Sequence, residues 1–116
     1  MHELSLAQAL VDQIVTAAER EQALRVERVV VVIGDYSGVE RGAFEFAFPF
    51  AAEKTIAEGA ELLIEASEAH AVCSRCGVQF DPGDAASACP ACGSDACSIE
   101  GGREFLIRSI DLEVGG

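Results

Sequence analysis

The stretch VERVVVVIG at residues 26–34 decides the fold. Its β-branched side chains favour an extended strand, and Gly34 ends the run. Because the apolar residues are nearly continuous, the strand should be buried on at least part of both faces. We therefore expect residues 26–33 to form the central strand of a small sheet.

Two helices and two more strands are expected around this strand. Residues 5–20 repeat apolar side chains at helical spacing, and Ser5 and Gln8 have the spacing of a capping box. The segment after Ser37 alternates phenylalanines like a strand but also suits a helix, which we favour, with a break or kink at Pro49. Strands are expected at residues 60–66 and 105–114. The predicted class is α+β or α/β, with two helices packed on a three-stranded mixed sheet.

Composition narrows the classes of function. The chain has 116 residues and a net charge of −12, which disfavours nucleic acid and anionic membrane surfaces as partners. No apolar run is long enough for a membrane span, so we expect no membrane association. The first residues lack the features of a secretory signal, which predicts a cytoplasmic protein. Only two histidines and no glycine-rich phosphate loop occur, so we expect no enzyme.

Two cysteine pairs carry the strongest chemical signal. Cys73 and Cys76 are followed, after a spacer, by Cys89 and Cys92, and a glycine follows each pair. This spacing is typical of a zinc ribbon, in which four thiolates close a tetrahedral structural site. Iron in a rubredoxin-like redox module and unligated thiols are the alternatives.

The ribbon is predicted to be an insert before the last strand. Residues 70–103 hold all five cysteines and too little aliphatic content for a core of their own. We expect residues 1–69 with 104–116 to form an α/β domain and residues 70–103 the zinc-ribbon domain. Cys97 is expected to be a small buried apolar side chain and not a fifth ligand or a reactive thiol. His70 is expected to be a polar residue at the entrance of the ribbon.

His2 gives a second metal signal. The amine of Met1, the amide nitrogen of His2 and its imidazole could close two chelate rings on one ion. Such a planar, nitrogen-rich set suits nickel(II) or copper(II) better than zinc. A histidine at this position is usually an ordinary surface residue, so both interpretations stay open on this feature alone.

Together these motifs resemble the HypA/HybF family of hydrogenase nickel-incorporation proteins. The resemblance covers the whole chain: MHELS before a helix, IG with SGVE after the first strand, CPACG in the ribbon, and GRE with SIDLE at the end. It implies a nickel metallochaperone for nickel–iron hydrogenase, in some members also for urease. The chain departs from the family pattern at Asp35–Tyr36 and at Pro49.

The resemblance also implies site residues and partners. Nickel would be held by His2, with Met1, Glu3 and Glu40 as further ligands, and zinc by Cys73, Cys76, Cys89 and Cys92. Glu40 has an alternative role as a carboxylate in the first turn of a helix. The partners would be the nickel-binding GTPase of hydrogenase maturation and the hydrogenase large subunit, and the chain would be a monomer or a weak homodimer. A zinc-ribbon adaptor that transports no metal remains an alternative.

Overall fold

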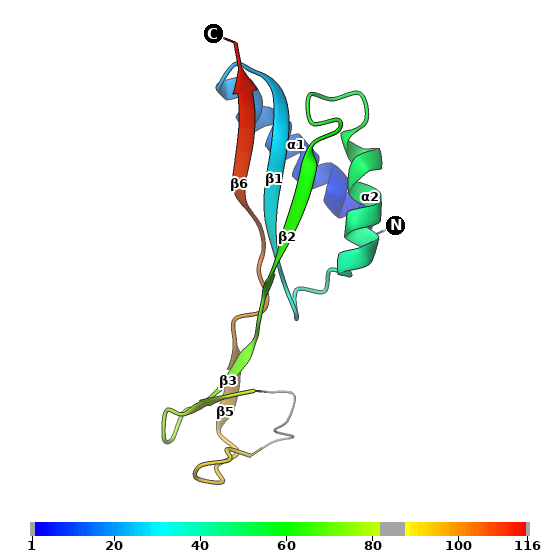
Figure 1. Ribbon diagram of the computed structural model, residues 1–116. Helices are drawn as coiled ribbons and strands as arrows, with labels where there is room; N and C mark the ends of the chain where they lie inside the picture. The colour runs from blue at the N-terminus through cyan, green and yellow to red at the C-terminus, as the bar shows by residue number, and fades with distance from the viewer. Residues whose placement is uncertain (1, 82–87, 116) are drawn as a thin grey trace.

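The computed structural model describes residues 2–81 and 88–115, and in them it contains two helices and two small sheets (Figure 1). The first sheet has the order β2-β1-β6 and the second the order β4-β3-β5. The elements are, in chain order, α1 (His2–Arg20), β1 (Ala23–Gly34), α2 (Arg41–Ala52), β2 (Glu61–Ser67), β3 (His70–Cys73), β4 (Gln79–Phe80), β5 (Cys97–Glu100) and β6 (Phe105–Val114). The predicted class, two helices on a three-stranded mixed sheet with a four-cysteine insert, is confirmed.

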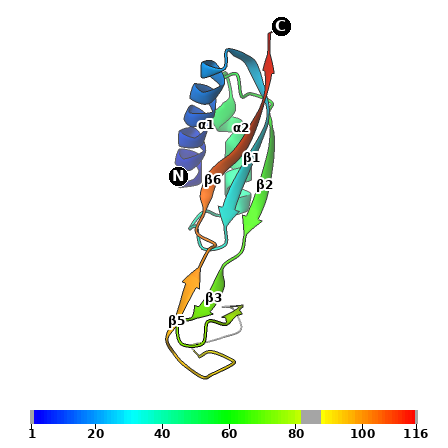
Figure 2. The same cartoon turned by 90° about the vertical axis from the view of Figure 1, so that its left-hand side faces the viewer.

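Strand β1 is the central strand, as predicted. It pairs in parallel with β2 and antiparallel with β6, which makes the sheet mixed. Figure 2 shows both helices on one face of this sheet. The side chains of Val29, Val31 and Ile33 face the helices and belong to the buried core. The opposite face carries ion pairs, such as that of Arg28 with Glu61 at 3.0 Å.

Helix α1 begins earlier than predicted. It starts at His2, so Ser5 lies inside the helix and the predicted capping box is wrong. Glu3 lies in the first turn, where a carboxylate interacts favourably with the positive end of the helix dipole. The apolar face is as expected, because Leu10 and Ile14 are buried against the sheet.

Helix α2 settles the ambiguous phenylalanine segment. Phe44 and Phe48 are buried, whereas Phe46 and Phe50 are exposed, which is the pattern of a helix and not of a strand. A break at Pro49 does not occur, because the helix is continuous from Arg41 to Ala52, so that alternative of the prediction is wrong. Pro49 lies on the exposed side of the last turn, where the missing N–H removes only one intrahelical hydrogen bond.

The two sheets follow one another along the long axis of a molecule that measures 59 × 31 × 17 Å. Two connections cross between them, from β2 to β3 and from β5 to β6 (Figure 1). Here the end of β1 touches the second connection: a Cβ on Gly34 would lie 2.1 Å from the carbonyl oxygen of Gly102, so only glycine fits. Ser67 Oγ donates to Glu104 Oε1 at 2.9 Å and ties the two connections together.

The burial of side chains on helix α2 predicts how truncating them changes the free energy of unfolding. Phe44 is 0% exposed and packs edge-to-face on Phe105, with ring centroids 5.4 Å apart, whereas Phe46 is 74% exposed. Phe44→Ala should lower the free energy of unfolding by about 3–5 kcal/mol because it leaves a cavity. The matched Phe46→Ala should change it by less than about 0.5 kcal/mol. Urea denaturation followed by circular dichroism measures both, and equal losses would contradict this packing.

Candidate metal centre

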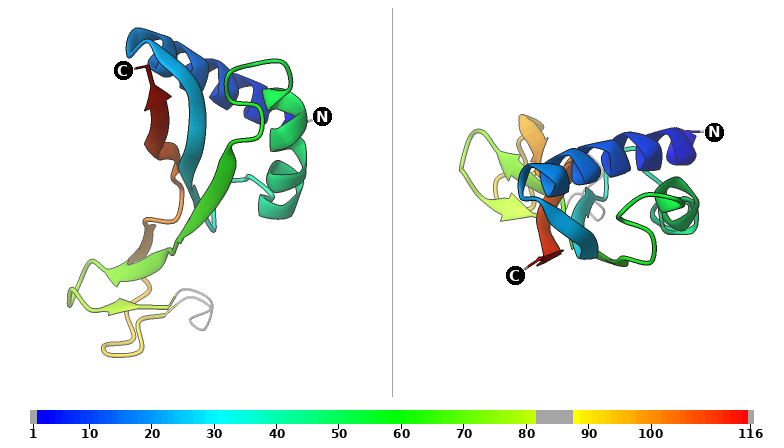
Figure 3. Two further views of the ribbon diagram at one scale, coloured as in Figure 1. Left: turned by 45° about the horizontal axis from the view of Figure 1, so that its top comes forward. Right: turned by 90° about the horizontal axis from the view of Figure 1, so that it is seen from above.

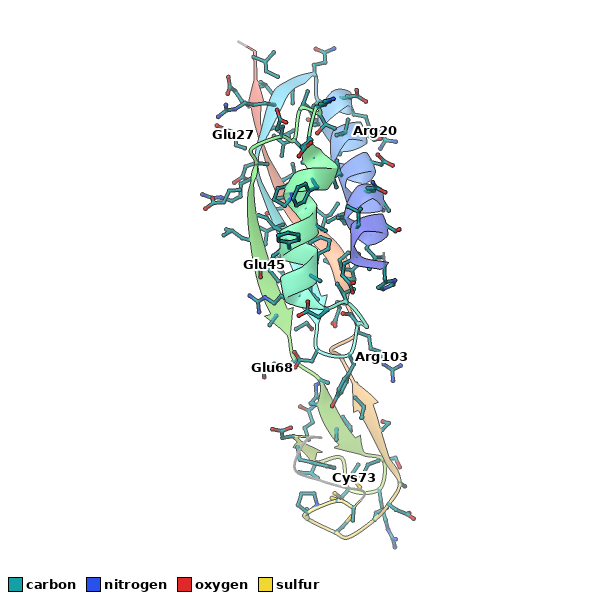
Figure 4. All side chains as sticks on the ribbon, turned by 90° about the vertical axis from the view of Figure 1, so that its right-hand side faces the viewer. Arg20, Glu27, Glu45, Glu68, Cys73 and Arg103 are labelled. Atoms are coloured by element: carbon teal, nitrogen blue, oxygen red, sulfur yellow. The ribbon has the colours of Figure 1, made fainter. Side chains whose placement is uncertain are left out.

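Four cysteine sulfurs converge in the second sheet, which lies at the end of the molecule away from the helices (Figure 4). The Sγ atoms of Cys73, Cys76, Cys89 and Cys92 all lie within 4.8 Å of one another. Cys73 Sγ is 3.6 Å from Cys92 Sγ, and Cys76 Sγ is 3.6 Å from Cys89 Sγ. The structure therefore brings together the four residues that the sequence predicted.

Each cysteine pair lies in a tight turn, and the two turns have the same hydrogen bonds. Gly77 N donates to Cys73 O at 2.8 Å, and Gly93 N donates to Cys89 O at 2.8 Å. Both glycines have positive φ, 80° and 77°, which side chains with a Cβ rarely adopt. The glycine after each pair is thus needed for the turn that points both sulfurs inward, as expected.

The cluster fits a tetrahedral metal ion. Four sulfurs each about 2.3 Å from one ion lie about 3.8 Å from each other in a tetrahedron. The observed 3.6 Å separations agree with this spacing. Cys73 and Cys89 are buried and Cys76 and Cys92 are exposed, so the cluster lies at the edge of the small sheet. Four thiolates fill the coordination of such an ion and leave no position for a substrate.

The sulfurs differ in acidity because their surroundings differ. The backbone N–H of Cys76 is the main cause that lowers the pKa of Cys73, to about 6. For Cys92 and Cys76 a backbone N–H, of Ser94 and Val78 respectively, lowers the pKa, but burial and the neighbouring sulfurs outweigh it. The pKa of Cys92 is raised to about 12, and that of Cys76 is also raised. Near neutral pH the cluster thus combines a thiolate at Cys73 with protonated thiols at Cys76 and Cys92.

Cys97 lies beside the cluster but outside the set of four. It is partly buried, so the expected burial of this side chain is only partial. Its Sγ donates to the carbonyl oxygen of Ser94 at 3.7 Å. Burial and the charge of Cys73 raise its pKa. His70 opens strand β3 and lines a cleft of about 430 Å³ at the junction of the two sheets, together with Asp35 and Glu68.

Three of the residues expected to bind nickel lie at the N-terminal ends of the two helices: His2 and Glu3 at the start of α1, and Glu40 at the start of α2. Figure 3 shows the N-terminal end of α1 next to α2. The backbone N–H of Glu40 donates to Glu3 Oε2 at 3.3 Å, which joins the first turn of α1 to the start of α2. The Glu40 carboxylate caps α2 by accepting from the backbone N–H groups of Gly42 and Ala43. Met1 lies outside the described residues.

A groove of about 520 Å³ lies directly beside His2. Glu3 lines it from α1, and the exposed rings of Phe46 and Phe50 line it from α2, with their centroids 5.4 Å apart. These two phenylalanines lie beside the residues expected to bind nickel, and the sequence analysis did not single them out. The signal was present, because a helical reading of the four alternating phenylalanines places two of them on the outer face.

Comparison with known proteins identifies the family of the chain. The family described as "Hydrogenase/urease nickel incorporation, metallochaperone, hypA" matches residues 1–112. A hydrogenase maturation factor HypA from Chlorobium limicola is 46% identical over 115 residues, covering 99% of each chain. The solution structure of the Ni metallochaperone HypA from Helicobacter pylori superposes with a TM-score of 0.67 at 28% identity, covering 97% of this chain and 98% of that one. A second solution structure of a HypA protein gives a TM-score of 0.75 at 29% identity, covering 99% and 98%.

Proton release should accompany metal binding at the cysteines. Because the pKa values of Cys76 and Cys92 are raised above the ordinary 9.0, both side chains carry protons at about pH 7.5 and must lose them to bind as thiolates. Zn²⁺ titrated into the reduced, metal-free chain should therefore release at least two protons per ion, and affinity should fall as pH falls. Calorimetry in two buffers of different ionisation enthalpy measures the number. Cys97→Ser should release the same number, and a release of less than one proton would contradict these acidities.

Proposed function

Because the chain belongs to the HypA family of hydrogenase/urease nickel-incorporation metallochaperones, we propose that it carries nickel(II) as cargo for the maturation of nickel–iron hydrogenase or urease. The observation that supports this most is the turn of His2 and Glu3, held beside Glu40 by the 3.3 Å hydrogen bond. This places an imidazole and two carboxylates at one exposed end of the two helices.

The proposed nickel site uses the first turn of α1. Backbone N–H groups in the first turn of a helix have no acceptor within that helix, so the amides of His2 and Glu3 are not committed to it. The amide and imidazole nitrogens of one histidine, with a further nitrogen from its neighbour, form the planar set that nickel(II) accepts. In this proposal His2 supplies its imidazole and amide nitrogens, and Met1 and Glu3 supply further nitrogen or oxygen.

Glu40 would join this set only by changing partners. Its carboxylate accepts two backbone hydrogen bonds at the start of α2, so ligation would compete with helix capping. We propose that Glu40 serves first as the cap that positions Glu3, and becomes a ligand when nickel is bound. The competition would weaken nickel binding and thereby favour release to an acceptor.

Zinc is proposed as the resident ion at the four cysteines. It would cross-link the two turns of a segment that has few buried apolar residues, among them Ala71 and Cys73. We propose that residues 1–69 with 104–116 and residues 70–103 are separate folding units, the second dependent on metal. The cysteines thus retain a structural ion, while the residues around His2 bind and release the cargo.

The partners are proposed on the basis of family membership. They are the nickel-binding GTPase of hydrogenase maturation and the hydrogenase large subunit, and we propose that they approach beside His2, where the groove lies. No helix among the described residues combines the length and apolar character needed to cross a bilayer. The cytoplasmic location and the monomeric or weakly dimeric state stay predictions.

Replacing each of the two histidines separates the proposed function from its alternatives. His2→Ala should lower nickel affinity at least tenfold and leave zinc content unchanged. The matched His70→Ala should retain nickel affinity, because His70 lines the cleft at the junction of the two sheets and not the groove beside His2. Equilibrium dialysis of zinc-loaded protein, with both metals quantified, measures the effect.

Two results would contradict the proposal. If His2→Ala binds one nickel as tightly as the parent, the adaptor without cargo becomes the better account. If the purified protein is red and holds iron in place of zinc, the rubredoxin-like account is favoured instead.

A further inference from the structure

The fifth cysteine lies directly opposite a member of the cluster. Cys73 ends β3 and Cys97 begins β5, and the two are partners in the antiparallel register. Opposite residues on neighbouring antiparallel strands project their side chains to the same face of the sheet. Cys97 therefore points to the side on which the Cys73 sulfur enters the cluster.

The hydrogen bonds identify the type of this pair. Ser74 N donates to Ala96 O at 2.9 Å, so the adjacent pair is hydrogen-bonded across the two strands. Cys73 N instead donates to Val78 O at 3.0 Å, away from β5. Because the two types alternate along a ladder, Cys73 and Cys97 occupy a non-hydrogen-bonded pair, in which the side chains are closest.

This geometry is that of a possible disulfide. Cα atoms of a non-hydrogen-bonded pair lie about 4.5 Å apart, and a disulfide needs about 4.4–6.8 Å. The chain is already paired here, so the bond would need no large backbone movement. Cys73 is fully buried, whereas Cys97 is partly exposed, so an oxidant from solvent has access to the pair through Cys97.

We propose that Cys73 and Cys97 form a cross-strand disulfide when a peroxide oxidises the ribbon. The peroxide takes two electrons from one sulfur of the pair, which becomes a sulfenic acid, and one water leaves. The other sulfur attacks that sulfenic sulfur, the S–S bond forms, and the departing hydroxide is protonated to a second water. In sum, two thiols and one hydrogen peroxide give one disulfide and two waters.

The disulfide would act on the metal cluster through Cys73. Once its sulfur is bonded to Cys97, only three of the four sulfurs remain for the ion, and affinity for the ion falls. The bond would at the same time keep β3 and β5 paired, so that the ribbon could rebind metal after a thiol reductant restores Cys73. The pair is thus proposed as a reversible oxidation site that protects the ribbon.

Two proteases can separate the cysteines for a direct test. Cleavage after lysine and arginine by one protease, and before aspartate by the other, leaves Cys73 on residues 55–75, Cys76 on 76–80, Cys89 and Cys92 on 84–94, and Cys97 on 95–103. Linkage of Cys73 to Cys97 therefore gives a mass that differs from its linkage to the fragment of Cys76 and from its linkage to the shared fragment of Cys89 and Cys92. The full chain is analysed for zinc, treated with hydrogen peroxide, blocked with a thiol reagent and mapped by mass spectrometry.

The expected product joins residues 55–75 to residues 95–103 and separates on reduction, with zinc release at the same rate and zinc rebinding after reduction. In Cys97→Ser the product should be absent and zinc rebinding after oxidation should fall at least twofold. The inference is overturned if Cys73 is joined mainly to 76–80 or 84–94, or if Cys97 stays a free thiol after zinc has left. Mass spectrometry detects the disulfide between Cys73 and Cys97 whichever metal the chain holds. The result is therefore independent of nickel binding at His2.

Discussion

The pairing of β1 on both of its edges is the interaction on which the rest of the structure depends. Strand β2 on one side and β6 on the other are positioned by it, and both helices pack on its buried side chains. The strand's end also fixes the second sheet, because β2 continues into β3, β5 leads into β6, and Gly34 contacts Gly102 where these connections meet. Figure 4 shows Glu68 and Arg103 at this junction, between the two parts. The cysteine cluster is therefore carried on the extensions of the strands that β1 pairs with.

The two proposed metal sites differ in how easily an ion could leave them. The four sulfurs surround one position and come from two turns with matching hydrogen bonds, so releasing an ion there means unfolding both turns. The residues at the start of α1 are exposed and are joined to α2 by the contact of Glu3 with Glu40, so a site there can open by small movements. On the proposed account the chain uses the first site for its own stability and the second for cargo.

The features predicted correctly were those with a local signal. The apolar run of β1, the spacing of the cysteine pairs and the glycines after them each act within a few residues, so the sequence alone was sufficient. The errors at Ser5 and Pro49 arose where a local rule competed with the rest of the fold: Glu3 allows α1 to begin at His2, and Pro49 lies where only one hydrogen bond is lost. The pairing of β3 with β5, and with it the position of Cys97 opposite Cys73, joins short segments far apart in sequence and had no periodic pattern to reveal it.

The central claim is that nickel and the ribbon metal occupy chemically different sites on one chain. X-ray absorption at the nickel edge, recorded on zinc-loaded protein with one equivalent of nickel, tests it most directly. The account predicts nitrogen and oxygen neighbours only, with the outer-shell scattering of an imidazole, which His2 would supply. Sulfur in the first coordination shell of nickel would contradict it, because the described residues supply such sulfurs only in the cysteine-rich segment.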